Sequence, residues 1–211
     1  MYYSKEAKEL STKEIYFLLT GGITPRPIAW VSTINKEGIT NIAPFSFFNA
    51  FSSNPPVVIF SPAISPDPDR PFKDTYLNLM ETQECVVNLV SFDLKEQMNL
   101  SAKDISSSEF KFAKIETINS DLVKSLRVKD SPFQMECKLM EMKTLGDKPG
   151  AGNLAICEIL KFHVKEDIFK EGTHRIDTGK ADIIGRLGGS NYARISNESI
   201  WHPFDKIDHS F

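Results

Sequence analysis

The chain has 211 residues, of which 41% are apolar and 25% are charged, and this composition is typical of a globular protein. The composition excludes intrinsic disorder and a collagen-like repeat. The length fits one large domain, which we predict to span residues 1–211. The formal net charge of -3 at pH 7 lacks the basic excess that is typical of nucleic-acid-binding domains. We therefore expect no nucleic-acid partner.

The three cysteines, Cys85, Cys137 and Cys157, lie in separate apolar stretches, without the spacing of a zinc site or a redox pair. Free cysteine in such a stretch behaves as a small buried apolar residue, and unpaired thiols are typical of the reducing cytoplasm. Residues 1–11 are polar and of mixed charge, and no stretch approaches the roughly eighteen apolar residues of a membrane helix. The chain is therefore predicted to be cytoplasmic, with no membrane partner.

The first predicted element is a short helix that follows a capping box. Ser11 caps the first turn, and Glu14 reaches back to the backbone of Ser11. Apolar residues continue as far as Leu19, after which Gly21 and Gly22 end the helix. Prolines at positions 25 and 27 then hold the chain extended.

A hairpin is predicted next. Residues 28–34 are rich in Val, Ile and Trp and form its first strand, and residues 39–43 form the returning strand. The turn at residues 35–38 ends in Gly38, which suits a positive φ. Residues 57–60 are predicted as a further strand. Four prolines within residues 62–71 predict an irregular loop, after which Asp74 caps a helix over residues 75–82.

The second half of the chain contains further short predicted elements. Residues 85–90 read as a buried strand, and residues 94–104 and 120–126 as short helices. Residues 134–142 alternate between apolar and polar side chains, which predicts a half-buried strand with Glu136 on its polar face. Residues 154–164 and 182–185 are predicted as strands. Many short strands with few short helices favour an antiparallel barrel or sandwich over a doubly wound parallel sheet.

No common catalytic motif is present: there is no dinucleotide-binding turn, P-loop, zinc-protease helix or serine-hydrolase elbow. The four histidines, His163, His174, His202 and His209, have no second ligand at metal spacing, so we expect solvated or structural roles and no metal. No side chain stands out as an acid, a base or a nucleophile, and we assign no catalytic residue. Either the protein only binds a ligand, or a cofactor supplies the reactivity.

Two segments could bind such a cofactor. Lys73, Asp74 and Thr75 open a predicted helix, and a helix N-terminus with a nearby lysine and hydroxyl suits a phosphate. The simpler interpretation is helix capping by Asp74 beside a solvated lysine. Residues 41–56 place four phenylalanines among Ser and Asn side chains, which could line a site for a planar ligand. Core packing is the alternative for this segment.

A glycine-rich loop and an arginine between two prolines could also contact a ligand. Residues 185–192 form a glycine-rich loop that would let a ligand approach the backbone, although a simple turn is the alternative. Arg26 stands between two prolines and could bind a phosphate, although a surface ion pair is the commoner role.

Taken in order, these segments resemble the flavin reductase-like family of FMN-binding split barrels, which includes flavoredoxin. The resemblance spans about residues 20–201. Its matching segments are TPRPIAWVST at 24–33, Gly38, NIAPFS at 41–46, NPP at 54–56, KDT at 73–75, CVVNL at 85–89, GRLGG at 185–189 and Tyr192.

The resemblance implies a mainly β fold, an antiparallel Greek-key split β-barrel with a few short helices, and a homodimer that holds FMN near its interface. Ser46, Phe47, Phe48 and Asn49 would approach the isoalloxazine and ribityl groups, with Ser61 beside them. The remaining implied contacts are Lys73, Asp74 and Thr75 near the phosphate, Arg26 also at the phosphate, and Tyr192 over the flavin.

The implied activity is that of a flavin-dependent oxidoreductase. A flavin reductase of this family would take a hydride from NADH or NADPH and pass electrons through bound FMN to a small-molecule or protein acceptor. Two alternatives stay open. One is an FMN-binding electron-transfer protein without direct NAD(P)H activity, and the other is a binding module that keeps the fold without the cofactor.

Overall fold

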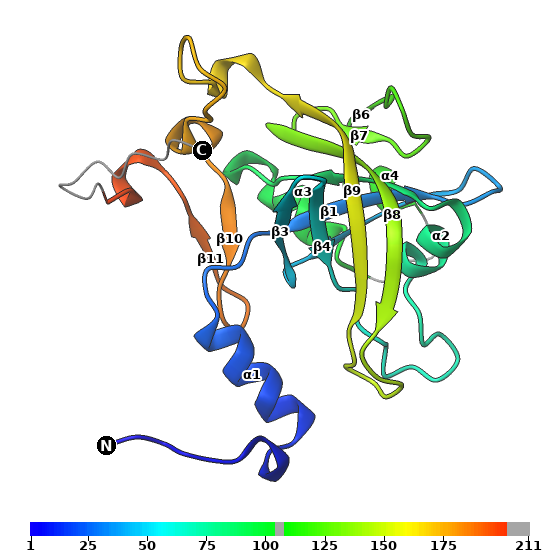
Figure 1. Cartoon of the computed structure of the whole chain (residues 1–211), viewed down its shortest axis with the longest axis vertical. Helices are drawn as coiled ribbons and strands as arrows, with labels where there is room; N and C mark the ends of the chain where they lie inside the picture. Colours follow the sequence, from blue (N-terminus) through cyan, green and yellow to red (C-terminus); the bar gives the residue numbers. More distant parts are fainter. Residues whose placement is uncertain (104–107, 202–211) are drawn as a thin grey trace.

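A seven-stranded antiparallel sheet that curls into an open barrel dominates the computed structural model (Figure 1). The structure describes residues 1–103 and 108–201. The strands of the sheet are β1 (Ala29–Ile34), β2 (Thr40–Phe45), β3 (Phe48–Ser53), β4 (Pro56–Phe60), β5 (Glu84–Asn88), β8 (Phe133–Thr144) and β9 (Asn153–Val164).

The barrel is split between two strands that follow each other in the chain. The sheet order is β2-β1-β5-β8-β9-β4-β3, so β2 and β3 occupy opposite edges. The chain therefore crosses the opening of the barrel at residues 46–47. This crossing places the Ser- and Phe-containing segment at the split, and the predicted antiparallel Greek-key split β-barrel is confirmed.

The predicted hairpin of β1 and β2 is also present, with Ala29 opposite Phe45 and Ile34 opposite Thr40. Two features close its turn. The Asn35 side chain accepts a hydrogen bond from the backbone N–H of Ile39 at 2.7 Å, and Gly38 has a φ of +82°. Only glycine adopts that φ without a steric penalty.

Replacing Gly38 with alanine is expected to lower the free energy of unfolding by about 1 kcal/mol, because a Cβ is disfavoured at positive φ. The control is Gly22→Ala at the end of α1 (Thr12–Gly22), where a Cβ would meet no atom within 4 Å. Urea denaturation measures both variants. Equal effects of the two substitutions would contradict the role given to the φ of Gly38.

Helix α1 begins at the predicted capping box. The Ser11 hydroxyl accepts from the backbone N–H of Glu14 at 3.3 Å, and the Glu14 carboxylate accepts from the backbone N–H of Ser11 at 2.8 Å. In Figure 1 the helix stands clear of the barrel, below the two-stranded ribbon of β10 (Ile184–Arg186) and β11 (Tyr192–Arg194).

The prediction that Asp74 caps the next helix is wrong. Helix α2 (Asp74–Thr82) begins one residue earlier, with Lys73 at the N-cap position and no side-chain cap. The Asp74 carboxylate lies within the first turn, where it pairs with Nη2 of Arg70 at 3.3 Å. A negative charge in a first turn is still favourable because of the helix dipole.

Two further expectations differ from the structure. Residues 120–126 are not helical, because three of their backbone N–H groups donate to the carboxylate of Glu136 instead of to helical carbonyls. Strand β3 was not predicted. It is an edge strand with mostly exposed residues, so it shows no apolar alternation.

The predicted polar face of residues 134–142 is buried at its start. Glu136 is fully buried and Gln134 is 4% exposed. The irregular segment between β6 (Thr117–Ile118) and β7 (Arg127–Val128) covers this face, since its backbone and Arg127 hydrogen-bond to both side chains. The alternation of apolar and polar residues in a strand does not indicate whether another segment of the same chain will cover its polar face.

Strand β1 is buried on both faces, so two cores meet at it. Ala29 and Val31 belong to the barrel interior, which also contains the three cysteines as free thiols. The predicted burial of the cysteines is confirmed. Trp30 faces the second core and donates from its indole N–H to the Ser101 hydroxyl at 2.8 Å, just after α3 (Lys95–Leu100).

The remaining elements are short: η1 (Ala7–Glu9), η2 (Phe92–Leu94), α4 (Glu109–Phe112), η3 (Glu166–Ile168), α5 (Thr178–Ala181) and η4 (Asn197–Ser199). Asp104, at the end of the helix predicted over 94–104, lies outside the described residues, as do His202 and His209. Within residues 1–103 and 108–201, no helix is both long enough and apolar enough to cross a membrane.

Candidate functional site

The chain crossing between β2 and β3 forms the centre of the candidate site. Phe48 lies opposite Phe60 where β3 pairs with β4, and the carbonyl of Phe47 accepts from the backbone N–H of Ser61 at 3.0 Å. These contacts bring the predicted residues Ser46, Phe47, Phe48, Asn49 and Ser61 into one region. The exposed side chain of Phe47 and the half-buried side chain of Phe48 leave aromatic surface for a ligand.

A pocket of about 370 Å³ lies at the N-terminus of α2 and receives the predicted residues Lys73, Asp74 and Thr75. Arg70 and Lys103 add two further cationic side chains to its lining. The backbone N–H groups at the start of a helix favour an anion. Three carboxylates, Asp67, Asp74 and Glu109, also line the pocket and balance its three cations, and Asp74 pairs with Arg70 at 3.3 Å.

Thr75 is held at the base of this pocket. Its side chain is 1% exposed, and its hydroxyl accepts a hydrogen bond from Nδ2 of Asn41 at 2.9 Å. Asn41 and Asn78 both donate to the hydroxyl of Thr33, at 3.2 and 3.0 Å. Asn41 lines the pocket; it begins the segment that the sequence marked as a possible site, but it was not singled out there as a contact. Nothing in its sequence neighbourhood indicated that it would meet a helix 34 residues further along.

A second pocket, of about 310 Å³, adjoins the first. Ala63 lines both pockets, and Phe47, Phe48, Asn49 and Ser61 line the second. Gly152 forms part of its wall, where an added Cβ would lie only 2.7 Å from the Ser61 hydroxyl. A side chain at position 152 would therefore push against Ser61, so glycine keeps this wall open.

A third pocket, of about 290 Å³, lies between the end of α1 and residues 46–49. It shares Phe47, Phe48 and Asn49 with the second pocket, and Arg26 and Ser46 also line it. Because neighbouring pockets share lining residues, we refer to the three together as the hollow band. Its end at α2 is lined by charged side chains of both signs, and its end at α1 is lined mostly by apolar side chains beside Arg26.

Two predicted residues have other partners. Arg26 is 6% exposed and donates to the carbonyls of Thr20 and Ile23 at 2.6 and 2.8 Å. Tyr192 lines none of the three pockets. Its hydroxyl accepts a hydrogen bond from Arg186, whose guanidinium lies 4.6 Å from the centre of its ring.

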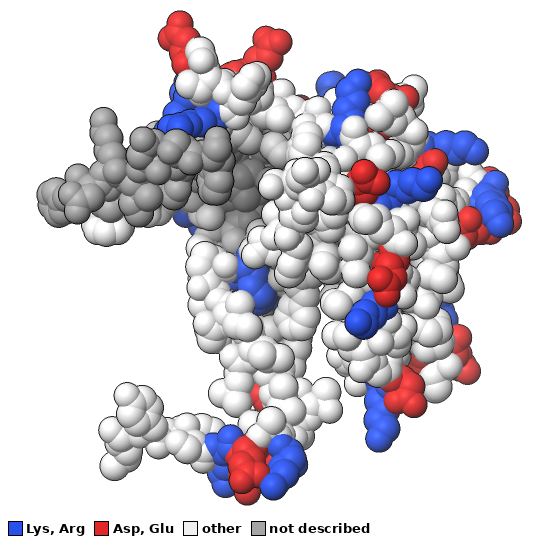
Figure 2. Space-filling view, in the orientation of Figure 1, with Lys and Arg blue, Asp and Glu red and all other residues white. Residues whose placement is uncertain are grey.

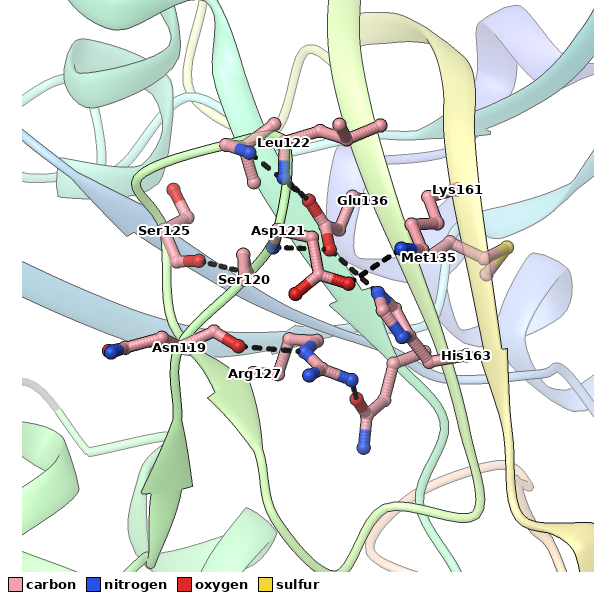
Figure 3. Close-up of polar contacts among 12 residues, drawn as sticks. Asn119, Ser120, Asp121, Leu122, Ser125, Arg127, Met135, Glu136, Lys161 and His163 are labelled. Atoms are coloured by element: carbon pink, nitrogen blue, oxygen red, sulfur yellow. Dashed lines mark hydrogen bonds and ion pairs between the residues drawn. The ribbon is translucent and has the colours of Figure 1, made fainter.

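A separate polar cluster lies on the outer side of β8 and β9 (Figure 3). Asp121, Glu136 and His163 offer ligand atoms within 4.8 Å of one another, which the sequence spacing did not indicate. Both oxygens of Glu136 are already in use. Oε1 accepts from the backbone of Asp121 and contacts His163 Nε2 at 2.6 Å, and Oε2 accepts from two further backbone N–H groups. These bonds leave the carboxylate poorly suited to a metal, and we assign the cluster a structural role.

The fold and the hollow band define a split-barrel protein with a polar pocket at a helix N-terminus beside more apolar pockets. The model of the flavin reductase like domain matches residues 21–179, and the chain belongs to this family. The predicted family is confirmed.

Individual proteins agree with this assignment. A protein of Aquifex aeolicus (strain VF5) is 37% identical over 193 residues, which cover 90% of this chain and 95% of that protein. The structure of nitrilotriacetate monooxygenase component B from Bacillus cereus is 33% identical with a TM-score of 0.86, covering 97% of this chain and 100% of that chain. Pseudomonas fluorescens 2-nitrobenzoate 2-nitroreductase is 28% identical with a TM-score of 0.84, covering 99% and 100%.

Proposed function

We propose that this protein is an FMN-binding oxidoreductase, a flavin reductase that takes electrons from NADH or NADPH. The observation that carries the proposal is the hollow band, because a phosphate-type pocket continues into an aromatic one. FMN has the same order of groups, a phosphate at one end and a planar ring system at the other. Membership of the flavin reductase like family supports the proposal.

The residues along the band fit this cofactor. Lys73 and the N-terminus of α2 would hold the phosphate, with the Thr75 hydroxyl beneath it. Phe47 and Phe48 would cover the ring system and exclude water, while Ser46, Asn49 and Ser61 offer hydrogen-bonding groups at its edge. Bound FMN would supply the redox chemistry, accepting a hydride and passing on electrons. No side chain of this chain is assigned as acid or base.

The acceptor in this proposal is a small molecule or a protein. Similarity to a monooxygenase component supports a partner oxygenase as the acceptor. Similarity to a nitroreductase supports a small aromatic acceptor instead. The proposal keeps the cytoplasmic location, which agrees with three thiols that are all buried and unpaired.

Anaerobic mixing of the FMN-loaded protein with NADH and with NADPH tests the activity. The visible absorbance of the flavin should bleach with at least one of the two donors. FMN binding without bleaching by either donor would contradict the reductase and favour an electron-transfer protein. A chain that takes up no FMN would contradict flavin binding and favour a binding module on this fold.

We also propose that the protein forms a homodimer through α1. Tyr16, Phe17 and Leu18 are 52%, 55% and 53% exposed, and consecutive helical residues point in different directions around the axis. Apolar side chains on every side of a helix are typical of a buried helix. In Figure 2 the surface over α1 carries few charged side chains except near its N-terminal end. A second copy would cover this helix.

Sedimentation is expected to show about twice the chain mass of 23.8 kDa. Leu18→Glu should shift the protein towards the monomer, because the substitution would bury a carboxylate at the interface. The matched control is Ile39→Glu, at an apolar residue that is 65% exposed on the hairpin turn. A monomeric wild-type protein at micromolar concentration, or dissociation by both variants, would contradict the assignment of α1.

A further inference from the structure

Arg26 is a buried cation whose partners come from three parts of the chain, two of them distant in sequence. Its Nη1 donates to the carbonyls of Thr20 and Ile23 at the end of α1. Its Nη2 donates to the carbonyl of Leu187 at 3.2 Å, and its Nε lies 3.4 Å from the hydroxyl of Ser46. The contacts to α1 are favourable because a helix C-terminus carries a partial negative charge.

The backbone around Arg26, where the end of α1 meets residues 185–188, is also closely packed. The backbone N–H of Arg26 donates to the carbonyl of Arg186 at 2.9 Å, and the return bond measures 2.8 Å. A Cβ added to Gly188 would lie 3.2 Å from the Cα of Gly21, and one added to Gly185 would lie 2.9 Å from Pro25. The C-terminal ribbon and the end of α1 are therefore in direct backbone contact beside Arg26.

Arg26 and the phosphate-type pocket lie at opposite ends of the band. Arg26 lines the apolar pocket beside α1, whereas Arg70, Lys73 and Lys103 line the pocket at α2. The two pockets share none of their lining residues among the described parts of the chain. Burial lowers the pKa of the Arg26 guanidinium, which agrees with a cation enclosed by carbonyl groups.

We propose that Arg26 is a positioning residue that joins α1, the loop at Leu187 and the Ser46 segment, and that it does not contact the phosphate. This inference rests on the proposed flavin site. By fixing the Ser46 end of the aromatic segment, the guanidinium orients the walls that receive the ring system. A lysine cannot replace it, because a single ammonium cannot reach three carbonyls and a hydroxyl in the same geometry.

Comparing FMN with riboflavin, which lacks the phosphate, tests this role. Arg26→Lys should weaken the binding of both ligands by the same factor, about tenfold, with unchanged stoichiometry. Lys73→Ala is the matched control and should weaken FMN binding alone. A loss of FMN affinity in Arg26→Lys without a loss for riboflavin would overturn the proposal in favour of a phosphate contact. Unchanged affinity for both would overturn it as well.

Gly188→Ala provides a second variant if Arg26→Lys does not fold. The added Cβ presses on Gly21 without removing the guanidinium. This variant should also lower the affinity for FMN and for riboflavin by the same factor. If this variant lowered the affinity for FMN alone, or for neither ligand, the proposed junction would be overturned.

Hydrogen exchange in the flavin-free protein separates this inference from the proposed function. Arg26→Lys should speed exchange about tenfold both at residues 184–194 and at residues 46–49, while β5 stays unchanged. Faster exchange in only one of these segments, or in neither, would overturn the positioning role. Failure of the wild-type protein to bind any flavin would instead contradict the proposed function.

Discussion

Replacing Glu136 with glutamine is expected to lower the free energy of unfolding by about 3 kcal/mol. The carboxylate is fully buried and accepts from the backbone N–H groups of Asp121, Leu122 and Val123, at 2.9, 2.6 and 3.1 Å. Glutamine has nearly the same volume, but its amide N–H₂ group would face the backbone N–H groups. Hydrogen-bond donors would then meet without an acceptor between them. Urea denaturation at pH 7 measures the difference.

The effect should depend on pH. Burial by itself raises the pKa of Glu136, but the three N–H donors and His163 more than offset it, so the pKa lies below its ordinary value of 4.5. A carboxyl group whose pKa is lower in the folded state stabilises the protein at a pH above its unfolded-state pKa. This stabilisation is lost as the pH falls through the folded-state pKa. The difference between wild type and variant should therefore be full above about pH 5 and shrink below about pH 4.

Glu141→Gln is the matched control, since Glu141 is an exposed residue of the same strand. It should change the free energy of unfolding by less than about 0.5 kcal/mol. A Glu136→Gln variant as stable as this control would contradict the structural role of the cluster. So would a loss of stability that stays constant between pH 3 and pH 7, roughly the range over which carboxyl groups titrate.

Replacing Lys73 with alanine is expected to weaken FMN binding by about 10- to 100-fold, the usual effect of losing a charged hydrogen bond to a phosphate. The Lys73 side chain lines the pocket, and its ammonium lies 5.9 Å from the ring centre of Phe45. Titration of the apoprotein, followed by quenching of flavin fluorescence, measures the affinity.

Riboflavin is the ligand control for this variant, and its affinity should not change. Lys143→Ala is the protein control, since Lys143 is exposed in β8 and lines none of the three pockets. Combining Lys73→Ala with Thr75→Ala should weaken FMN further, but it is less specific because buried Thr75 also anchors Asn41. Unchanged FMN affinity in the double variant would refute the phosphate role of both residues.

Local patterns were sufficient to predict much of the fold. The capping box of α1, the glycine turn between β1 and β2, and the long strands β8 and β9 depend on neighbouring residues, and each is present. The irregular segment at 120–126 was predicted wrongly because its backbone donors bond to Glu136, which lies in another strand. Strand β3 was missed because it lies at the edge of the sheet and most of its residues are exposed. Its sequence therefore shows no alternation of apolar and polar residues.

The candidate site depended more on distant contacts. The separate segments at 46–49 and 73–75 were identified from the sequence, and Ala63, which no pattern marked, joins their pockets. The contact of Asn41 with Thr75 was not predicted, because the two residues are remote in the chain. Arg26 was expected at the phosphate, whereas its observed bonds reach Leu187, 161 residues away.

By itself, the sequence determined most strands of the barrel, the turn at Gly38 and the family, because these depend on the order and spacing of residues that are close in the chain. Only the tertiary structure decided which charged side chains stay available for a ligand. The Arg26 guanidinium donates to the carbonyl of Leu187, and the Glu136 carboxylate accepts from backbone N–H groups of Asp121 and Leu122, so long-range contacts occupy both side chains. Lys73 lines an open pocket at the start of a helix. The physical reason is that the burial of a charge depends on the long-range packing around it.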